Sequence, residues 1–280
     1  MREINVSEIT AVVKTMSINA NYYLGSDIKN QIVRSYCREP WPIAKDILSK
    51  ILNNIDISQN ENRPICQDTG MTCVFIEVGQ DVHIVGGNIE DAINEGVRQG
   101  YLEGYLRKSV VRDPLDRVNT RDNTPAVINY TIVPGDKLKI TVAPKGFGSE
   151  NMSQIKMLKP ADGIDGVKKF VIKVVEEAGP NPCPPIVVGV GIGGTFDRAA
   201  LIAKKALIRP LTQRNENKLY RNLEQELLEK INTLGIGPQG FGGRATALAV
   251  NIETYPTHIA GLPVAVNISC HVTRYEEVEL

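Results

Sequence analysis

The spacing of apolar residues predicts helices in the first part of the chain and a mixture of strands and helices after it. Residues 42–55 place isoleucine and leucine at helical intervals, which gives one apolar face. Similar stripes predict helices over residues 7–24, 88–108, 195–208 and 216–234, another from residue 26 or 27, and one ending near 178. Apolar runs predict strands over residues 72–78, 186–190, 246–252 and 264–272, and a hairpin over 126–142 that turns at 133–136.

This mixture predicts an α/β (α+β) fold, with a mostly helical part over about residues 1–60 and a mixed sheet core. At about 150 residues per domain, 280 residues correspond to between one and two domains. No linker or fixed-period repeat interrupts the pattern. We therefore expect a single domain over residues 1–280.

Charge and composition exclude several classes of protein. The chain has 32 basic and 32 acidic residues, so it lacks the net positive charge that is typical of nucleic-acid binders. The longest uncharged stretch, residues 178–196, contains four prolines and five glycines, which argues against a membrane helix. The first residues, MREINVSEITAVVK, lack the apolar core and cleavage site of a signal peptide. Five scattered cysteines are then best interpreted as thiols of a cytoplasmic protein.

A glycine-rich run at residues 189–194 has the spacing of a dinucleotide-binding motif. Gly189, Gly191 and Gly194 follow an apolar strand and precede a helix. The second strand and acidic residue that such a unit needs are missing, because IRPLTQRNENKLYRN follows the helix. We therefore favour close packing of a strand and a helix as the reason for these glycines, with residues 193–195 left as a possible anion contact.

Two of the five cysteines stand where a metal ligand is plausible. Cys270 lies in phase with the buried residues of the last strand, whereas Cys66 lies in the turn PICQDTG and Cys183 lies between prolines in NPCPP. Loops of this kind lie at surfaces and clefts, and thiolates on rigid loops suit a soft metal centre. Cys37 and Cys73 fit the more common role of a small buried apolar residue.

The set ICQDTG, KGFGSEN, CPP followed by GIGGT, and a late cysteine in VNISCHVTR resembles the iron–sulfur hydro-lyases of the class I fumarase and tartrate dehydratase type. The resemblance covers nearly the whole chain and implies the N-terminal domain type of that family. It also implies that Cys66, Cys183 and Cys270 hold a [4Fe–4S] cluster. With three protein ligands, one iron keeps an open position and can act as a Lewis acid in the reversible hydration of fumarate to malate.

The resemblance also implies roles for five further residues. It places Gln67, Asp68, Arg107 and Gly148 at the substrate, and Asp68 and His258 in catalysis. Taken without the resemblance, each has an ordinary alternative. Asp68 could stabilise its own turn, Arg107 could be a solvated charge at a helix end, and His258 could be a hydrogen-bonded structural residue.

The family occurs as long single chains and as paired subunits. This chain ends ten residues after Cys270, so we expect an α subunit that works with a separate β subunit in an α2β2 heterotetramer. Fumarate and malate are the expected substrates, and L-tartrate is the alternative within the family. A non-catalytic iron–sulfur scaffold, with Cys73 as a fourth ligand, is the alternative from another class of protein.

Overall fold

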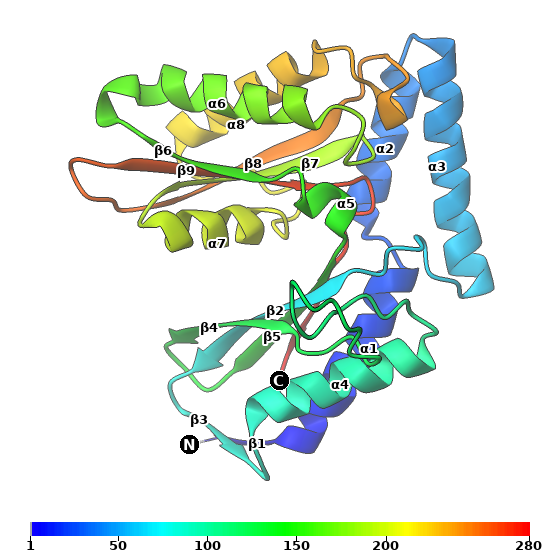
Figure 1. Cartoon of the computed structure of the whole chain (residues 1–280), viewed down its shortest axis with the longest axis vertical. Coiled ribbons are helices and arrows are strands. Elements are labelled where there is room, and N and C mark those ends of the chain that lie inside the picture. The colour runs from blue at the N-terminus through cyan, green and yellow to red at the C-terminus, as the bar shows by residue number, and fades with distance from the viewer. Residues whose placement is uncertain (1) are drawn as a thin grey trace. The chain divides into compact units, whose positions relative to one another are not determined.

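A computed structural model describes residues 2–280, and its internal packing divides them into two compact units (Figure 1). The first unit contains residues 2–24, Asp56–Phe147 and Arg274–Leu280, and the second contains Gly25–Ile55 and Gly148–Thr273. Each unit therefore combines segments that are far apart in the sequence. The single domain over residues 1–280 stays a prediction.

The first unit is built on a four-stranded sheet in the order β10-β5-β2-β4. Strand β2 is antiparallel to β5 and parallel to β4, while β10 is antiparallel to β5. A separate parallel pair joins β1 and β3. The six strands are β1 (Arg2–Asn5), β2 (Met71–Gly79), β3 (Val82–Val85), β4 (Val127–Val133), β5 (Leu138–Lys145) and β10 (Glu276–Glu279).

The predicted hairpin over residues 126–142 is wrong, although both of its strands exist. Strand β2 lies between β4 and β5, so the two strands on either side of the turn do not pair with each other. At the end of β2, the backbone N–H groups of Gly79 and Gln80 donate to the carbonyls of Lys137 and Val133. The turn therefore closes around the end of β2, whose continuous apolar run is typical of a central strand.

Two helices of the first unit, α1 (Val6–Tyr22) and α4 (Ile89–Glu103), lie on one face of its sheet (Figure 1). Their backbones approach closely because α4 has glycine where it meets α1. A Cβ on Gly96 would lie 2.7 Å from the Thr10 carbonyl, and one on Gly100 would lie 2.9 Å from the Lys14 carbonyl. Apolar residues of α1, α4, β2 and β5 form the core beneath them.

The second unit is built on a four-stranded sheet in the order β6-β9-β7-β8. Its central strand β7 is parallel to β8 and antiparallel to β9. Helices α6 and α8 cover one face and α7 covers the other (Figure 1). The elements are β6 (Gln154–Leu158), α6 (Gly163–Ala178), β7 (Ile186–Gly193), α7 (Phe196–Ala206), α8 (Lys218–Asn232), β8 (Ala247–Tyr255) and β9 (Leu262–Ser269).

The glycine-rich run of β7 is explained by packing. A Cβ on Gly189 would lie 2.2 Å from the Ala203 carbonyl, and one on Gly191 would lie 2.1 Å from the Ala199 carbonyl, so α7 rests directly on the strand. This confirms the packing interpretation of the motif. The Gly194 amide, one of the predicted anion contacts, donates instead to the Pro256 carbonyl at 3.2 Å.

The predicted helices of the N-terminal region are present, and with the mixed sheets they confirm the α/β class. Besides α1 they are α2 (Ser26–Arg38) and α3 (Pro42–Glu61), and a short helix α5 (Phe147–Glu150) occurs later. The prediction that Cys37 is a small buried residue is wrong, because Cys37 is exposed. It lies about 140° around α2 from the buried Ile32, on a different face of the helix. In residues 2–280, no helix has the length and apolar character needed to cross a bilayer.

Candidate active site

In the first unit, Cys66, Gln67 and Asp68 form the loop that leads into β2. The Cys66 thiol lies 3.5 Å from the Gln67 side-chain oxygen, to which it donates. Asp68 Oδ1 accepts the Gly70 amide at 3.1 Å, and its Oδ2 accepts the Phe147 amide at 2.9 Å. Asp68 therefore does stabilise its own turn. It also ties the turn to the KGFGSEN segment, which the resemblance had placed at the substrate.

Gly70 is the residue that lets this loop lie so close to β5. Its φ is +79°, a conformation that favours glycine, and an added Cβ would lie 2.8 Å from the backbone of Lys145. A larger residue would have to push β2 and β5 apart. The D-T-G sequence thus sets the position of the Asp68 carboxylate relative to the end of β5.

Arg107 is held beside the same loop through its backbone. Helix α4 ends at Glu103 and not near Lys108 as predicted, so Arg107 is on a loop, where its side chain is exposed. The Thr69 hydroxyl donates to the Arg107 carbonyl at 2.9 Å. Because Thr69 is next to Asp68, the structure brings the predicted carboxylate-binding arginine and the predicted catalytic acid into one loop cluster.

Two buried side chains hold this cluster from the core side. The Tyr101 hydroxyl lies 2.6 Å from the Thr69 carbonyl and 3.0 Å from the Gly70 carbonyl, between which its proton is shared. Asn123 donates from Nδ2 to the same Gly70 carbonyl at 3.2 Å. Burial raises the pKa of Tyr101 to about 12, so the hydroxyl stays a donor over the whole neutral range.

Arg274 is a residue of the first unit that the sequence analysis missed. Its side chain is buried, with 6 % exposed, and Nη2 donates to the Asp68 carbonyl. Its Nε and Nη1 atoms have no hydrogen-bond partner among residues 2–280. A buried guanidinium with unpaired nitrogens is unusual, because buried charges are costly unless they are fully paired. The sequence signal was its place as the last residue of the motif VNISCHVTR.

In the second unit, Cys183 and Cys270 are brought to the same end of the sheet. Cys183 precedes β7, has φ +55° and donates its amide to the Pro180 carbonyl at 3.1 Å. Cys270 follows β9, which ends at Ser269 and not at Val272 as predicted, and Ser269 is paired with Val187 near the start of β7. Cys183 is exposed and Cys270 is half-buried, so both thiols lie outside the core.

Two polar side chains that the sequence analysis did not select hold the Cys183 loop in place. His271 Nδ1 lies 2.9 Å from the Cys183 carbonyl oxygen. In the Nδ1-H tautomer it donates a hydrogen bond to that oxygen. Gln239 donates from both its backbone N and its Nε2 to the Pro184 carbonyl, each at 2.8 Å. Because His271 is next to Cys270, this network links the two cysteine loops directly.

His258 is not brought together with these cysteines within its own unit. It lies in the exposed turn between β8 and β9, where its Nδ1 accepts the Ala260 amide at 3.2 Å. Strand β8 ends at Tyr255, which pairs with Gly193 at the far end of β7. The eight residues of β7, about 25 Å of extended chain, separate this turn from the cysteine end of the sheet.

Gly148 lies in α5 with open space beside it. An added Cβ would meet no atom closer than the Asn181 carbonyl at 3.9 Å. Protein packing therefore does not require glycine at this position. Open space beside the backbone fits the predicted approach of a ligand.

The three proposed ligand cysteines have the chemistry that an iron–sulfur cluster needs. All three are on loops, where Cys66 and Cys270 are half-buried and Cys183 is exposed. Cys73, by contrast, is 5 % exposed and packs within β2. Soft sulfur donors on short, hydrogen-bonded loops suit iron–sulfur centres. Within residues 2–280, no group of three or more His, Cys, Asp or Glu side chains is gathered into a site for a single metal ion.

Comparison with known proteins places the chain among the hydro-lyases. A family model described as fumarate hydratase (Fumerase) matches residues 10–279, and the chain belongs to this family. It is 44% identical over 273 residues to a protein of Methanocaldococcus jannaschii with the provisional name L(+)-tartrate dehydratase subunit alpha, covering 95% of both chains. It is 32% identical to the L(+)-tartrate dehydratase subunit alpha of Escherichia coli O157:H7, covering 96% of this chain and 89% of the relative. The protein of that name from E. coli K12 is 31% identical, with the same coverage.

Proposed function

We propose that this chain is the α subunit of an iron–sulfur hydro-lyase that reversibly adds water to fumarate to give (S)-malate. Membership of the fumarate hydratase family supports the reaction class, and the names of the relatives support an α subunit with a separate β partner. The observation that carries the proposal is the pair of thiol loops joined by the His271 hydrogen bond to Cys183, together with the Cys66-Gln67-Asp68 loop. A cytoplasmic α2β2 assembly remains part of the proposal.

Cys66, Cys183 and Cys270 would hold the [4Fe–4S] cluster. When bound, such a cluster supplies one iron with an open coordination position that acts as a Lewis acid toward the substrate hydroxyl and carboxylate. The hydrogen bonds to the carbonyl and from the amide of Cys183 hold the backbone of its loop in place. Preorganised ligands of this kind lower the cost of ordering the site.

The remaining residues of the loop cluster would bind and orient the substrate. Arg107 is exposed and can form a bidentate pair with one substrate carboxylate, and Gln67 can donate from its side-chain amide. Asp68 is half-buried, with one amide donated to each oxygen, which leaves lone pairs on both oxygens for a substrate hydroxyl or proton. Gly148 leaves its backbone open to a ligand.

The overall reaction removes hydroxide from one substrate carbon and a proton from its neighbour, and reverses both steps for hydration. Asp68 would orient the hydroxyl-bearing carbon or hold a proton during the reaction. The base that takes the carbon-bound proton would come from the β subunit. His258 remains a proposed catalytic residue, although it lies far from Cys183 and Cys270 within its own unit.

L(+)-tartrate is the second candidate substrate, because the named relatives are tartrate dehydratase α subunits. Tartrate and malate share the four-carbon dicarboxylate frame, and tartrate carries one more hydroxyl group. The two activities therefore need the same carboxylate grip and the same elimination. They differ in whether a polar partner is available for the second hydroxyl.

The decisive experiment is anaerobic reconstitution of the chain, co-expressed with its β subunit, with iron and sulfide. Turnover is then measured on malate, fumarate and L(+)-tartrate. We expect iron-dependent activity that is higher on malate and fumarate than on tartrate. Higher kcat/KM on tartrate would establish the second candidate, and no iron-dependent activity on any of the three would overturn the proposal.

Cysteine variants separate the enzyme from the scaffold. Cys183→Ser should lose both the cluster absorbance and the activity, and the matched control Cys37→Ser, at an exposed cysteine of α2, should keep both. Cys73→Ser should also keep both, because Cys73 packs within β2. Loss of the cluster in Cys73→Ser would favour the scaffold, in which four cysteines fill every iron position.

A further inference from the structure

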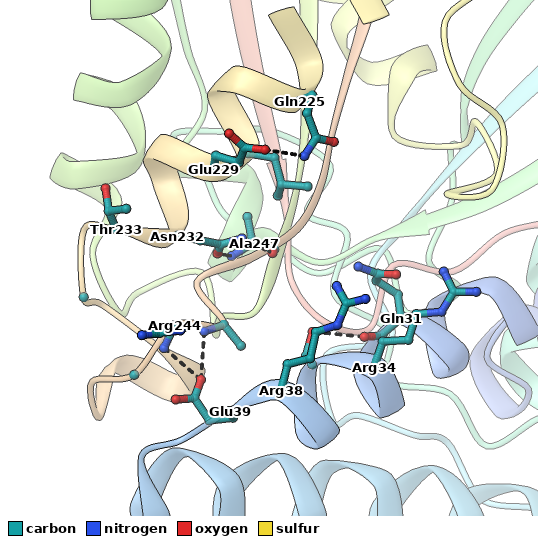
Figure 2. A pocket seen from close by; sticks show the side chains of 15 residues that line it. Gln31, Arg34, Arg38, Glu39, Gln225, Glu229, Asn232, Thr233, Arg244 and Ala247 are labelled. Atoms are coloured by element: carbon teal, nitrogen blue, oxygen red, sulfur yellow. Dashed lines mark hydrogen bonds between the residues drawn. The ribbon is translucent and has the colours of Figure 1, made fainter. Parts of the chain in front are cut away.

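The second unit has a large cavity that the proposed reaction does not use. Its volume is about 740 Å³, within the range of small-molecule sites, and it lies between α2, α8 and the segment that leads into β8. Figure 2 shows α2 side chains on one side, including Arg34 and Arg38, and α8 side chains on the other, including Gln225 and Asn232. None of the proposed cluster or substrate residues lines this cavity.

Three arginines make the cavity suited to an anion. Arg34 and Arg38 are four residues apart on α2, which places them on one face of the helix, and Arg244 lies on the segment before β8. Within residues 2–280, none of these three guanidinium groups has an ion-pair partner. An adjacent cavity of about 310 Å³ shares Arg34 with the first and adds Arg214.

In the described part of the chain, the carboxylates of the cavity accept hydrogen bonds from amides and form no ion pair with these arginines. Glu39 is 4 % exposed and its carboxylate accepts backbone amides of Arg244 at 2.8 Å and Ala245 at 3.0 Å, with a third from Trp41 at 3.2 Å. Two of these amides donate to Oε2 and one donates to Oε1, so the carboxylate is held against the backbone. Glu229 accepts the side-chain amide of Gln225 at 2.6 Å, on the α8 side of the cavity. The guanidinium groups on α2 therefore face the cavity with their donors available.

We propose that this cavity binds a small polyanion that carries at least two phosphate or carboxylate groups. Arginine presents planar donors that match the oxygens of both groups, and two or three such residues can hold a ligand with separated charges. Leu228, Ala245 and Ala247 supply an apolar surface for the carbon skeleton of the ligand. The size, the unpaired arginines and the apolar surface together favour an organic polyanion over a single monovalent ion.

Isothermal titration calorimetry of the full chain tests this proposal with three probes: pyrophosphate, citrate and inorganic phosphate. We expect pyrophosphate or citrate to bind at least tenfold more tightly than inorganic phosphate. Tighter binding of pyrophosphate would assign the site to phosphorylated ligands, and tighter binding of citrate would assign it to polycarboxylates. Equal binding of the two would support their shared polyanion chemistry.

Variants identify the cavity as the site. Arg34→Gln combined with Arg38→Gln should weaken the tighter probe at least tenfold, and Arg244→Gln should weaken it independently. The matched control is Arg221→Gln, an exposed arginine of α8 that does not line the cavity, which should bind within twofold of the wild type. The proposal is overturned if no probe binds, if phosphate binds as well as the polyanions, or if the control loses as much as the double variant. Binding is measured without turnover, so its failure would leave the proposed enzyme activity untouched.

Discussion

Arg274 illustrates how a residue that was not selected as a site residue can hold a candidate site loop. Its guanidinium is buried in the first unit and donates to the carbonyl of Asp68, while two of its nitrogens have no partner among residues 2–280. A fork of donors in a fixed plane can hold a backbone carbonyl in one direction. We infer that Arg274 positions the Asp68 loop and does not itself bind the substrate.

Substitution of Arg274 should lower turnover more than it lowers cluster content. Arg274→Met in the reconstituted complex is expected to reduce kcat/KM by about 10- to 100-fold, because small displacements of positioned groups are costly in catalysis. Iron content should stay at the wild-type level, and Arg274→Lys should recover part of the loss. The control is Arg112→Met, an exposed arginine paired with Asp116. Equal kcat/KM in wild type and Arg274→Met would contradict the positioning role.

Tyr101 should make the stability of the first unit sensitive to alkaline pH. Burial raises its pKa from 10.0 to about 12 in the folded chain, so the unfolded chain releases the proton at lower pH than the folded chain does. The contribution of Tyr101 to the free energy of unfolding is therefore complete below pH 10. It is lost as the pH rises through 12, which lowers the free energy of unfolding by up to about 3 kcal/mol. Urea denaturation at pH 8 to 12 measures the effect.

Tyr101→Phe should reduce that dependence, because phenylalanine does not titrate. The difference between the two proteins isolates Tyr101 from Tyr22 and Tyr130, whose pKa values burial also raises. Identical pH slopes in the wild type and the variant would show that Tyr101 does not contribute. The variant also loses the hydrogen bonds to Thr69 and Gly70, so only the slope is diagnostic.

His258 should affect turnover without affecting the cluster. Within the second unit it is separated from Cys183 and Cys270 by the length of β7, so it does not help to hold the thiols. His258→Asn is therefore expected to keep iron content and cluster absorbance. If the histidine acts in proton transfer, kcat should fall by about 100-fold or more. Unchanged kcat would remove His258 from the catalytic set.

At the scale of elements, the glycines of β7 test the packing explanation of the glycine-rich run. Gly191→Ala should lower the free energy of unfolding by about 1–3 kcal/mol, because its Cβ would lie 2.1 Å from the Ala199 carbonyl of α7. The matched control is Gly261→Ala in the same unit, where the nearest atom is 3.8 Å away. Chemical denaturation compares the two. Equal stability of Gly191→Ala and wild type would reopen the search for a ligand at the glycine-rich run.

The sequence predicted most elements and their type, but not how the strands pair. The apolar periods of α3, α6 and α8 are strong, and they appear nearly where expected. The pairing of β2 between β4 and β5 was not predictable, because a Pro-Gly turn after β4 is also the signal of a simple hairpin. Strand order depends on packing between distant segments, and a local pattern holds no information about it.

The candidate site divides in the same way. Cys66 and Cys183 were predictable because proline, glycine and aspartate place them on loops, and the ordered motifs then pointed to Cys270. Arg274, His271 and Gln239 were not, since each acts through a backbone carbonyl that is far away in the sequence. The structure supplies these partners. His271 and Arg274 lie within the motif VNISCHVTR, but the motif does not show what their side chains contact.

At the scale of the whole molecule, a net charge of zero is compatible with local sites for anions. The chain has equal numbers of acidic and basic residues, so the proposed recognition of a dicarboxylate would depend on individual placed donors such as Arg107. The cavity beside α2 follows the same principle. Its arginines are left available because Glu39 is occupied by backbone amides. Charge is therefore arranged at each site and not through the surface as a whole.

The proposed division of labour between subunits leads to a prediction for the chain alone. Its sequence aligns along 95% of a relative named as an α subunit, and the residues proposed for cluster and carboxylate binding are all present. No base for the carbon-bound proton is assigned among them. The purified chain, reconstituted with iron and sulfide, should therefore show cluster absorbance with little hydratase activity. Addition of the β subunit should raise turnover by about 100-fold or more, the contribution typical of a positioned general base.

The control for this experiment is Cys183→Ser with the β subunit added, which should remain inactive because one thiol of the proposed cluster site is missing. If the β subunit alone carried the chemistry, this variant complex would be active. If the α chain carried all of it, the isolated wild-type chain would convert malate to fumarate at the rate of the complex. Activity that requires both the three cysteines of this chain and the partner is the result that a shared active site predicts.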